Sequence, residues 1–439
     1  QEFVWKGLNQ YYLWQPNVPD LADDRFQSTA QFDNFLSAYG SPENVFEHLL
    51  YERGTVDRWS VIFSDFFVLE NALQGVVKSN GVEFGLKYVP GSITQIFGYV
   101  RYIQPNSDAS TKDIHRDDLF YAINGTPLTT SNYNSLLDLD TYTLNLADYA
   151  CRALTPNGRD ITLTKVQYAE NPVYASNVIT QGSHTIGYLM YNGFYASYDD
   201  QLNGVFGQFA SAGVTDLVLD LRYNGGGSIR TATYLASMIT GQFTNQLFAR
   251  QQWNPKMQAI YESQNPGALQ NLFASQLSGG ASINHLNLNK VYIITTGSTA
   301  SASELVINCL RPYIDVVTIG TTTIGKNVGS VTLYDSPDFT RHNINGSHLY
   351  AMQPIVLKLV NKDNFGEYSQ GLAPTYELPE DMGNLGVIAD PSEPLFAKAI
   401  AVITGSGRFA PVPDREFRHF ADSKSIRRFG NEMYREDLP

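Results

Sequence analysis

The sequence predicts an α/β protein with a helical N-terminal region and a β-rich segment before its main α/β layer. Three changes of pattern along the 439 residues support this class. Apolar and aromatic residues recur at helical spacing up to about residue 80, and short segments of alternating polarity then follow. After about residue 171, continuous apolar strands alternate with helical stretches, as in βαβ units. We therefore expect four regions, with bounds 1–80, 81–167, 168–389 and 390–439, the last belonging to the same domain as the third.

Helices in the first region are indicated by the segments 32–36 and 45–50, in which apolar residues recur at helical spacing. Ser41-Pro42-Glu43 is a helix-start signal, because serine caps free amides and proline fits the first turn.

The second region predicts a compact unit of about five strands with one or two helices. Asn124-Gly125 is a tight-turn signal directly after one of the strands. Residues 144–151 favour a helix. The expected strands cover 82–88, 98–103, 118–123 and 160–166.

Strands of the third region consist of uninterrupted apolar residues, which is typical of strands buried on both faces. The expected strands cover 215–221, 290–295 and 315–320, and the expected helices cover 229–239 and 302–310. The last region should hold one helix, 394–403, followed by a charged tail.

Composition narrows the classes of function. Thirty basic residues against 43 acidic ones give a net charge of −13, which argues against nucleic acid or an anionic membrane surface as a partner. No apolar run reaches the length of a membrane span. Seven widely spaced histidines and two cysteines, Cys151 and Cys309, form no metal-binding motif, and we expect Cys309 to be a buried helix residue. The start at Gln1 and the abundance of tyrosine suggest a processed protein of the bacterial cell envelope or a secreted protein.

Ser301 and Lys326 are the residues that point to chemistry. Ser301 lies where an apolar strand is expected to turn into a helix, and Lys326 follows 25 residues later in a glycine-flanked turn. A serine hydroxyl becomes a nucleophile when a neighbouring base takes its proton, and lysine is such a base when its surroundings keep it neutral. The uncharged segment 318–325 before Lys326 favours that neutral state, and Thr323 is placed to orient the amine. The alternatives are a serine that only caps the helix together with Glu304, and a solvated turn lysine.

Three consecutive glycines, residues 225–227, follow the strand that ends in Asp220-Leu-Arg-Tyr-Asn. Glycines permit close approach of the backbone to a ligand, with amides directed at developing negative charge. A plain strand-to-helix turn is the alternative. A phosphate-binding loop is less favoured, because no Gly-Lys-Ser/Thr follows.

These motifs, in this order, resemble those of the carboxyl-terminal processing (tail-specific) serine peptidases. The resemblance rests on residues 220–227, 299–304 and 320–326, and on Gln370-Gly-Leu-Ala-Pro374 as a late element, so that it covers about residues 180–400. It implies a crotonase/ClpP-like α/β core preceded by an inserted PDZ domain. Residues 82–166 suit the PDZ role, because 117–125 resemble a PDZ signature and Phe84, Gly85 and Leu86 take the place of its carboxylate-binding loop.

The resemblance also implies the role of each site residue. Ser301 is then the nucleophile and Lys326 the general base of a Ser-Lys dyad without metal or organic cofactor. The remaining roles fall to the amides of Gly226, Gly227 and Ala302 as an oxyanion hole, and to Glu304 and Thr323 as supporting residues. Ser330 stands where many members carry a glutamine that orients the lysine.

The expected function is a serine endopeptidase that cleaves polypeptides recognised near their C-termini, as a monomer or a homo-oligomer. Two alternatives stay open: a peptide-binding relative whose site never assembles, and a crotonase-type acyl-CoA enzyme. If the protein belongs to the cell envelope, a lipoprotein whose signal is absent from this sequence is one alternative.

Overall fold

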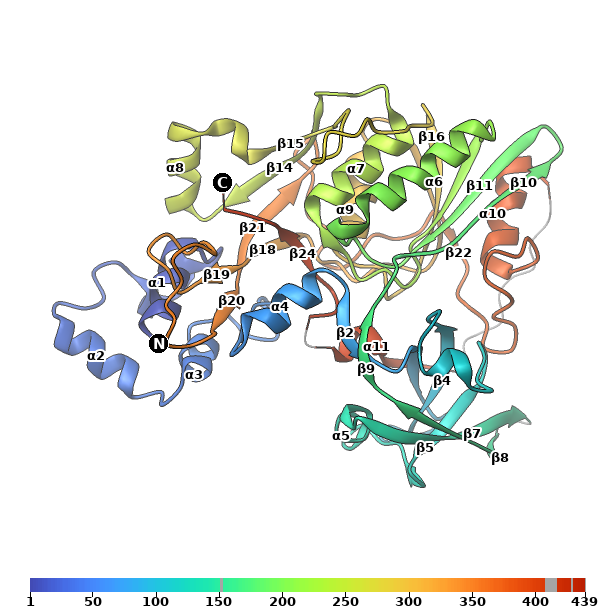
Figure 1. The fold of residues 1–439 in the computed structure, drawn as a ribbon, viewed down its shortest axis with the longest axis horizontal. Helices are drawn as coiled ribbons and strands as arrows, with labels where there is room; N and C mark the ends of the chain where they lie inside the picture. Colours follow the sequence, from blue (N-terminus) through green and yellow to red (C-terminus); the bar gives the residue numbers. More distant parts are fainter. Residues whose placement is uncertain (151–152, 407–416, 428, 439) are drawn as a thin grey trace.

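A helical region, a β-rich lobe and a large α/β lobe follow one another along the chain in the computed structural model (Figure 1). The structure describes residues 1–150, 153–406, 417–427 and 429–438. Cys151 lies outside these residues, whereas Cys309 is buried in a helix as expected. In the described part, no helix is both long and apolar enough to cross a membrane.

The N-terminal region is mainly helical, as predicted, and Ser41 caps its third helix by accepting the amide of Asn44. A short strand of this region pairs with the α/β lobe, which anchors the region to the lobe. The elements are α1 (Glu2–Tyr11), α2 (Thr29–Ser37), α3 (Pro42–His48), β1 (Val61–Phe63) and α4 (Phe66–Leu73), with 3₁₀ turns at Gln15–Asn17 and Pro19–Leu21.

The β-rich lobe is built on an antiparallel sheet around its own apolar core. Residues 144–150 belong to a strand, so the helix predicted for this stretch is wrong. The elements are β2 (Val76–Ser79), β3 (Val82–Tyr88), β4 (Ile96–Ile103), β5 (Leu119–Ile123), β6 (Thr126–Pro127), α5 (Tyr133–Asp138), β7 (Thr141–Ala150), β8 (Ala153–Thr164) and β9 (Val166–Ala169), with a 3₁₀ turn at Ala109–Thr111.

The α/β lobe contains a sheet with the order β10-β11-β12-β16-β17-β22, in which β11, β12, β16 and β17 run parallel. Its strands and helices include the expected ones nearly residue for residue. They are β10 (Val173–Gln181), β11 (His184–Tyr191), α6 (Asp199–Ser211), β12 (Asp216–Asp220), α7 (Ile229–Thr240), β16 (Lys290–Thr295), α9 (Ala302–Leu310), β17 (Asp315–Gly320), β22 (Tyr376–Glu377) and α10 (Pro394–Thr404), with a 3₁₀ turn at Ala196–Tyr198.

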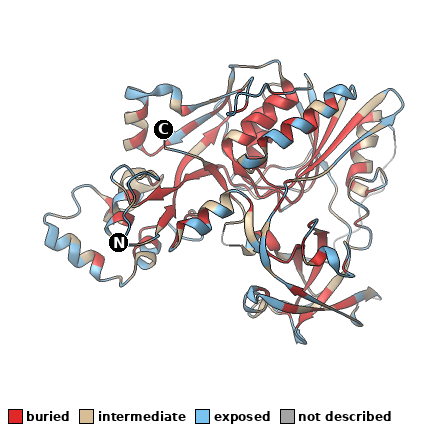
Figure 2. Ribbon diagram, in the orientation of Figure 1, coloured by how far each residue is buried: buried red, intermediate tan, exposed pale blue. Residues whose placement is uncertain are grey.

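Helices cover both faces of this sheet, which explains the uninterrupted apolar strands. Leu217 and Leu219 of β12 pack with α6, α7 and α9, whereas Val218 packs against α10 on the opposite face. Figure 2 shows α7 and α9 as largely buried elements of the lobe.

A second sheet, with the order β13-β24-β18-β21-β14-β15, lies beside the first and includes the C-terminal strand. The remaining elements are β13 (Gly227–Ser228), β14 (Leu247–Trp253), α8 (Pro255–Gln264), a 3₁₀ turn at Pro266–Leu269, β15 (Gln270–Leu272), β18 (Val328–Val331), β19 (Leu333–Tyr334), β20 (Ala351–Gln353), β21 (Ile355–Val360), β23 (His419–Asp422), α11 (Ser423–Ile426) and β24 (Met433–Arg435). The described part of the tail expected after 403 therefore contains two strands and a helix.

A buried ion cluster fixes the loop that leaves β12. The side chain of Arg222 has no exposed area and pairs with Asp220 at 2.7 Å and with Glu393 at 2.7 Å. Glu393 also caps α10 by accepting the amide of Phe396. The cluster therefore ties the start of the glycine loop to the helix on the far face of the sheet.

Replacing Arg222 by methionine should destabilise the protein by about 3–5 kcal/mol, because two buried carboxylates lose their partner. Urea unfolding measures this change. The matched variant Arg250→Met, at an exposed position, should stay within about 0.5 kcal/mol of the wild type. Equal unfolding midpoints for the two variants would contradict the assigned role.

Candidate active site

Ser301 has a strained backbone at the turn from β16 into α9. Its φ of 64° and ψ of −117° lie in a region that residues other than glycine rarely adopt. A strained strand-to-helix turn of this kind presents the nucleophilic serine of α/β-hydrolases. The surrounding structure thus holds Ser301 in a conformation that a simple helix cap does not need.

The Ser301 hydroxyl is buried and has no hydrogen-bond partner among the described residues. Glu304 fulfils its half of a capping box by accepting the Ser301 amide at 2.7 Å. Ser301 Oγ lies on the Glu304 amide side in the other half of the box, but it does not reach hydrogen-bond geometry with that amide. The helix start is therefore stabilised by the carboxylate, and the hydroxyl is left available for other chemistry.

Glu304 joins the serine turn to the lysine turn. Its buried carboxylate accepts the amides of Gly325 at 2.7 Å and Lys326 at 2.9 Å, in addition to that of Ser301. Thr323 donates its hydroxyl to the same carboxylate. Thr323 therefore orients Glu304, and the prediction that it orients the Lys326 amine is wrong.

Lys326 is wholly buried, in contrast to a solvated turn lysine. Its Nζ donates to the carbonyl of Asn431 and to Oε2 of Glu432, each at 2.7 Å. Burial lowers the pKa of Lys326, and the negative charge of Glu432 opposes this shift. Burial likewise raises the pKa of Glu432 to about 7. Both shifts disfavour the charged forms of the two groups relative to their solvated forms.

The Lys326 amine and the Ser301 hydroxyl are not joined by a hydrogen bond, because Ser301 Oγ has no partner in the described part of the chain. Glu304 brings the two backbones together, whereas the C-terminal segment holds the Lys326 side chain. Ser330, expected at the lysine-orienting position, hydrogen-bonds Met433 and Gln353 instead.

The glycine loop approaches Ser301 closely. Gly226 and Gly227 have φ angles of 107° and 139°, which favour glycine. A Cβ added to Gly226 would lie 2.5 Å from Ser301 Cβ and 3.0 Å from the amide nitrogen of Ala302. Only glycine therefore fits beside the serine.

The three predicted oxyanion amides differ in their hydrogen-bond partners. The Gly226 amide donates to Oδ1 of Asn224 within the loop, at 2.8 Å. The Gly227 amide instead donates to the carbonyl of Glu432, and Ala302 begins α9, where amides lack intrahelical acceptors. Because the Gly226 amide is engaged within its own loop, the Gly227 and Ala302 amides are better candidates than Gly226 for donating to an oxyanion.

Phe84, Gly85 and Leu86 lie in strand β3, so their assignment to a loop is wrong. The edge of β3 pairs with β23, in which Asp422 lies opposite Gly85 and Ala421 opposite Leu86. Phe84 and Leu86 are buried in the core of the β-rich lobe.

Sequence reasoning missed Glu432, Asn431 and Trp59. The Lys326 amine lies 5.5 Å from the centre of the Trp59 ring. Glu432 is 106 residues from Lys326 along the chain, and no local pattern connects such positions. The role of Asn224 could have been predicted, because an asparagine side chain in a turn often accepts the backbone amide two residues later.

Comparison with known protein families identifies the family of this chain. Residues 185–349 match the model of peptidase family S41, and residues 1–61 match the S41 N-terminal domain. The chain belongs to this family. The matched range includes Ser301, Lys326 and the glycine loop.

Individual known proteins with low sequence identity to this chain agree with this family. A carboxyl-terminal-processing protease of Picosynechococcus sp. is 23% identical over 249 residues, which is 53% of this chain and 51% of that protein. The chain spans about half the length of the curated relatives it matches. A structure from Bacteroides fragilis, described as an S41 protease, has a TM-score of 0.67 and 26% identity, covering 92% of this chain and 97% of the other.

The photosystem II D1 C-terminal processing protease shares the fold, with a TM-score of 0.50 and 17% identity. The alignment covers 87% of this chain and 92% of that protein.

Replacing Glu304 by glutamine should destabilise the protein by about 2–4 kcal/mol, because an amide cannot accept from four donors as a carboxylate does. Thermal unfolding measures the loss. The same exchange at the exposed Glu367 is the matched control and should leave the melting temperature unchanged. A melting temperature of Glu304→Gln equal to that of the wild type would show that the carboxylate does not organise the site.

Proposed function

We propose that this protein is a serine endopeptidase in which Ser301 is the nucleophile and Lys326 the general base. The observation that carries the proposal is the strained backbone of Ser301, whose hydroxyl has no partner among the described residues and lies beside Gly226 and the Ala302 amide. A buried lysine with a lowered pKa, linked to the serine turn through Glu304, supports the role of the base.

The proposed reaction is acyl transfer. Neutral Lys326 accepts the Ser301 proton, and the oxygen attacks a peptide carbonyl. The Gly227 and Ala302 amides stabilise the oxyanion of the tetrahedral intermediate. The protonated lysine then gives its proton to the leaving amine, and water hydrolyses the acyl-enzyme with the lysine again acting as base. The lysine has to leave Glu432 for this cycle to begin.

Polypeptides are the proposed substrates, as expected of the family. We interpret the α/β lobe as crotonase/ClpP-like and the β-rich lobe as PDZ-like, located in the cell envelope or outside the cell. Recognition of substrate C-termini at Phe84, Gly85 and Leu86 stays a prediction, because β23 covers that edge here. The acyl-CoA alternative is set aside, since the chain belongs to a peptidase family.

A catalytically silent relative is the second candidate. The observation that favours it is the Lys326–Glu432 ion pair, which keeps the amine on the C-terminal segment. Turnover of an unfolded protein, lost on mutation of either dyad residue, would exclude this candidate.

Ser301→Ala and Lys326→Arg should each reduce cleavage of an unfolded protein by at least about a thousandfold, because they remove the nucleophile and the titratable base. Initial rates of peptide release measure this. The controls are the same exchanges at the exposed Ser263 and Lys290, which should keep wild-type rates. Activity retained in Lys326→Arg would remove the lysine from the mechanism.

The rate of Ser301 acylation should rise with pH, because the base acts only when deprotonated. Burial lowers the pKa of Lys326, whereas Glu432, Asp57 and Glu304 raise it, and burial is the larger influence. The midpoint should therefore lie below that of a free lysine. The rate of labelling by a fluorophosphonate probe between pH 5 and 11 tests this. A pH midpoint of that rate at or above about 10.4 would show that the amine has the pKa of a solvated lysine.

A further inference from the structure

The C-terminal strand β24 fills a slot one strand wide beside the proposed catalytic residues. It runs parallel to both neighbours, with Met433 opposite Gly227 of β13 and Tyr434 opposite Ser330 of β18. Without β24, both neighbours would present unpaired backbone groups to an incoming chain. Addition of an extended peptide as a strand is a common mode of peptide recognition.

The backbone of this segment lies where a scissile carbonyl is expected. The Glu432 carbonyl accepts the Gly227 amide. A Cβ built on Gly226 would lie 2.3 Å from the Glu432 carbonyl oxygen, as well as close to Ser301 Cβ and the Ala302 amide. The carbonyl, the serine and both proposed oxyanion donors thus surround one point.

The side chain of the same residue engages the proposed base. Glu432 pairs with Lys326 at 2.7 Å, and the neighbouring Asn431 carbonyl accepts a second hydrogen bond from the amine. An ammonium held in an ion pair cannot accept the Ser301 proton. Glu432 therefore occupies both groups: its carbonyl binds the Gly227 amide, and its carboxylate binds the Lys326 amine.

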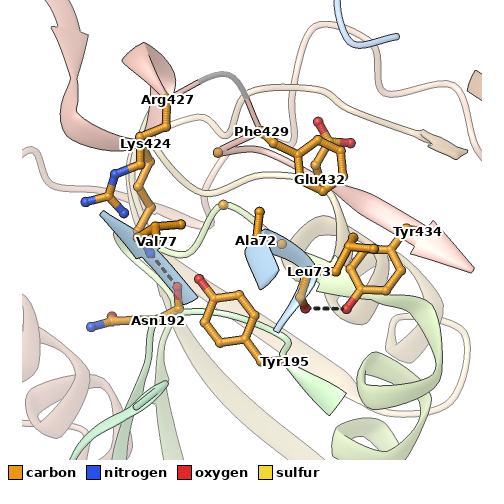
Figure 3. Close-up of a pocket in the computed structure, with 14 residues that line it drawn as sticks. Ala72, Leu73, Val77, Asn192, Tyr195, Lys424, Arg427, Phe429, Glu432 and Tyr434 are labelled. Carbon is orange, nitrogen blue, oxygen red and sulfur yellow. Dashed lines mark hydrogen bonds between the residues drawn. The ribbon is translucent and has the colours of Figure 1, made fainter. Parts of the chain in front are cut away.

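Side-chain contacts on either side hold the segment in the slot. The Tyr434 hydroxyl donates to the Leu73 carbonyl at 2.8 Å, as Figure 3 shows, and Arg435 donates to the Ala268 carbonyl at 3.0 Å. The cavity that remains beside the glycine loop measures about 40 Å³, which is too small for a peptide substrate.

We propose that the slot between β13 and β18 is the groove for an extended polypeptide substrate, and that residues 430–436 are its intramolecular occupant, which blocks turnover until it leaves. This inference rests on the proposed function, because it needs Ser301 and Lys326 as the reacting groups.

Glu432→Gln tests the proposal in the full chain, because the variant keeps the shape of the side chain and loses its charge. The rate constant for fluorophosphonate labelling of Ser301 should rise on the order of tenfold, as expected for loss of one charged hydrogen bond. Tyr434→Phe removes only the anchor on Leu73 and should raise the rate about fivefold. Cleavage of an unfolded protein should rise in parallel.

The matched control is Glu367→Gln, the same exchange at an exposed site, which should label at the wild-type rate. A synthetic peptide of residues 429–438 should inhibit Tyr434→Phe at a lower concentration than it inhibits the wild type, whose slot is already filled. This measurement keeps the proposal testable if Glu432→Gln does not fold.

Unchanged or slower labelling of variants with wild-type melting temperatures would overturn the inference and make β24 a permanent structural strand. Failure of the proposed function has a different signature: Ser301 would stay unlabelled in the wild type and in every variant, and both proposals would then fall together.

Discussion

The buried carboxylate of Glu304 is the interaction on which the rest of the site depends. It accepts three backbone amides and one hydroxyl, from a helix start and from a turn more than twenty residues later. A carboxylate is costly to bury unless its oxygens are fully hydrogen-bonded, so the two segments are held together by the need to satisfy it. The serine and the lysine are positioned by this backbone anchor before their side chains interact.

The glycine loop is held in a complementary way. Ions on the far side of the sheet fix its first residues through Arg222, and Asn224 fixes its middle by taking the Gly226 amide. The Gly227 amide, in turn, donates to the carbonyl of Glu432 in the C-terminal segment. Strain at Ser301 persists because both neighbouring segments are anchored independently of it.

The parts of the fold that the sequence predicts well are those whose residues are buried on both faces. Strands β16 and β17 and helix α9 match their predicted bounds, because continuous apolar runs and a capping signal depend little on distant partners. The helix predicted over 144–151 is wrong for residues 144–150, which belong to β7. Pairing of β7 with β5 and β8 overrides the local propensity, and the alternation of Leu144 and Leu146 agrees with the strand.

The proposed catalytic pair and the proposed oxyanion glycines can be found in the sequence, because each lies in a short motif. The partner of the lysine was not, since Glu432 belongs to a polar tail whose strands exist only through pairing with β3, β13 and β18. Polar segments that borrow their structure from other sheets leave no periodicity to detect. The strand predicted over 82–88 is confirmed, whereas the cover that β23 places on its edge at residues 84–86 leaves no signal in the local sequence.

The C-terminal segment that contains β23 and β24 also connects the β-rich lobe to the α/β lobe. Strand β23 is an edge of the β-rich lobe, and β24 lies in the α/β lobe. Ten residues separate them, and such a length spans at most about 35 Å when fully extended. Helix α11 shortens that reach further. The tail is therefore a short connection between the two lobes, and a separation of the lobes beyond this reach would pull on β24.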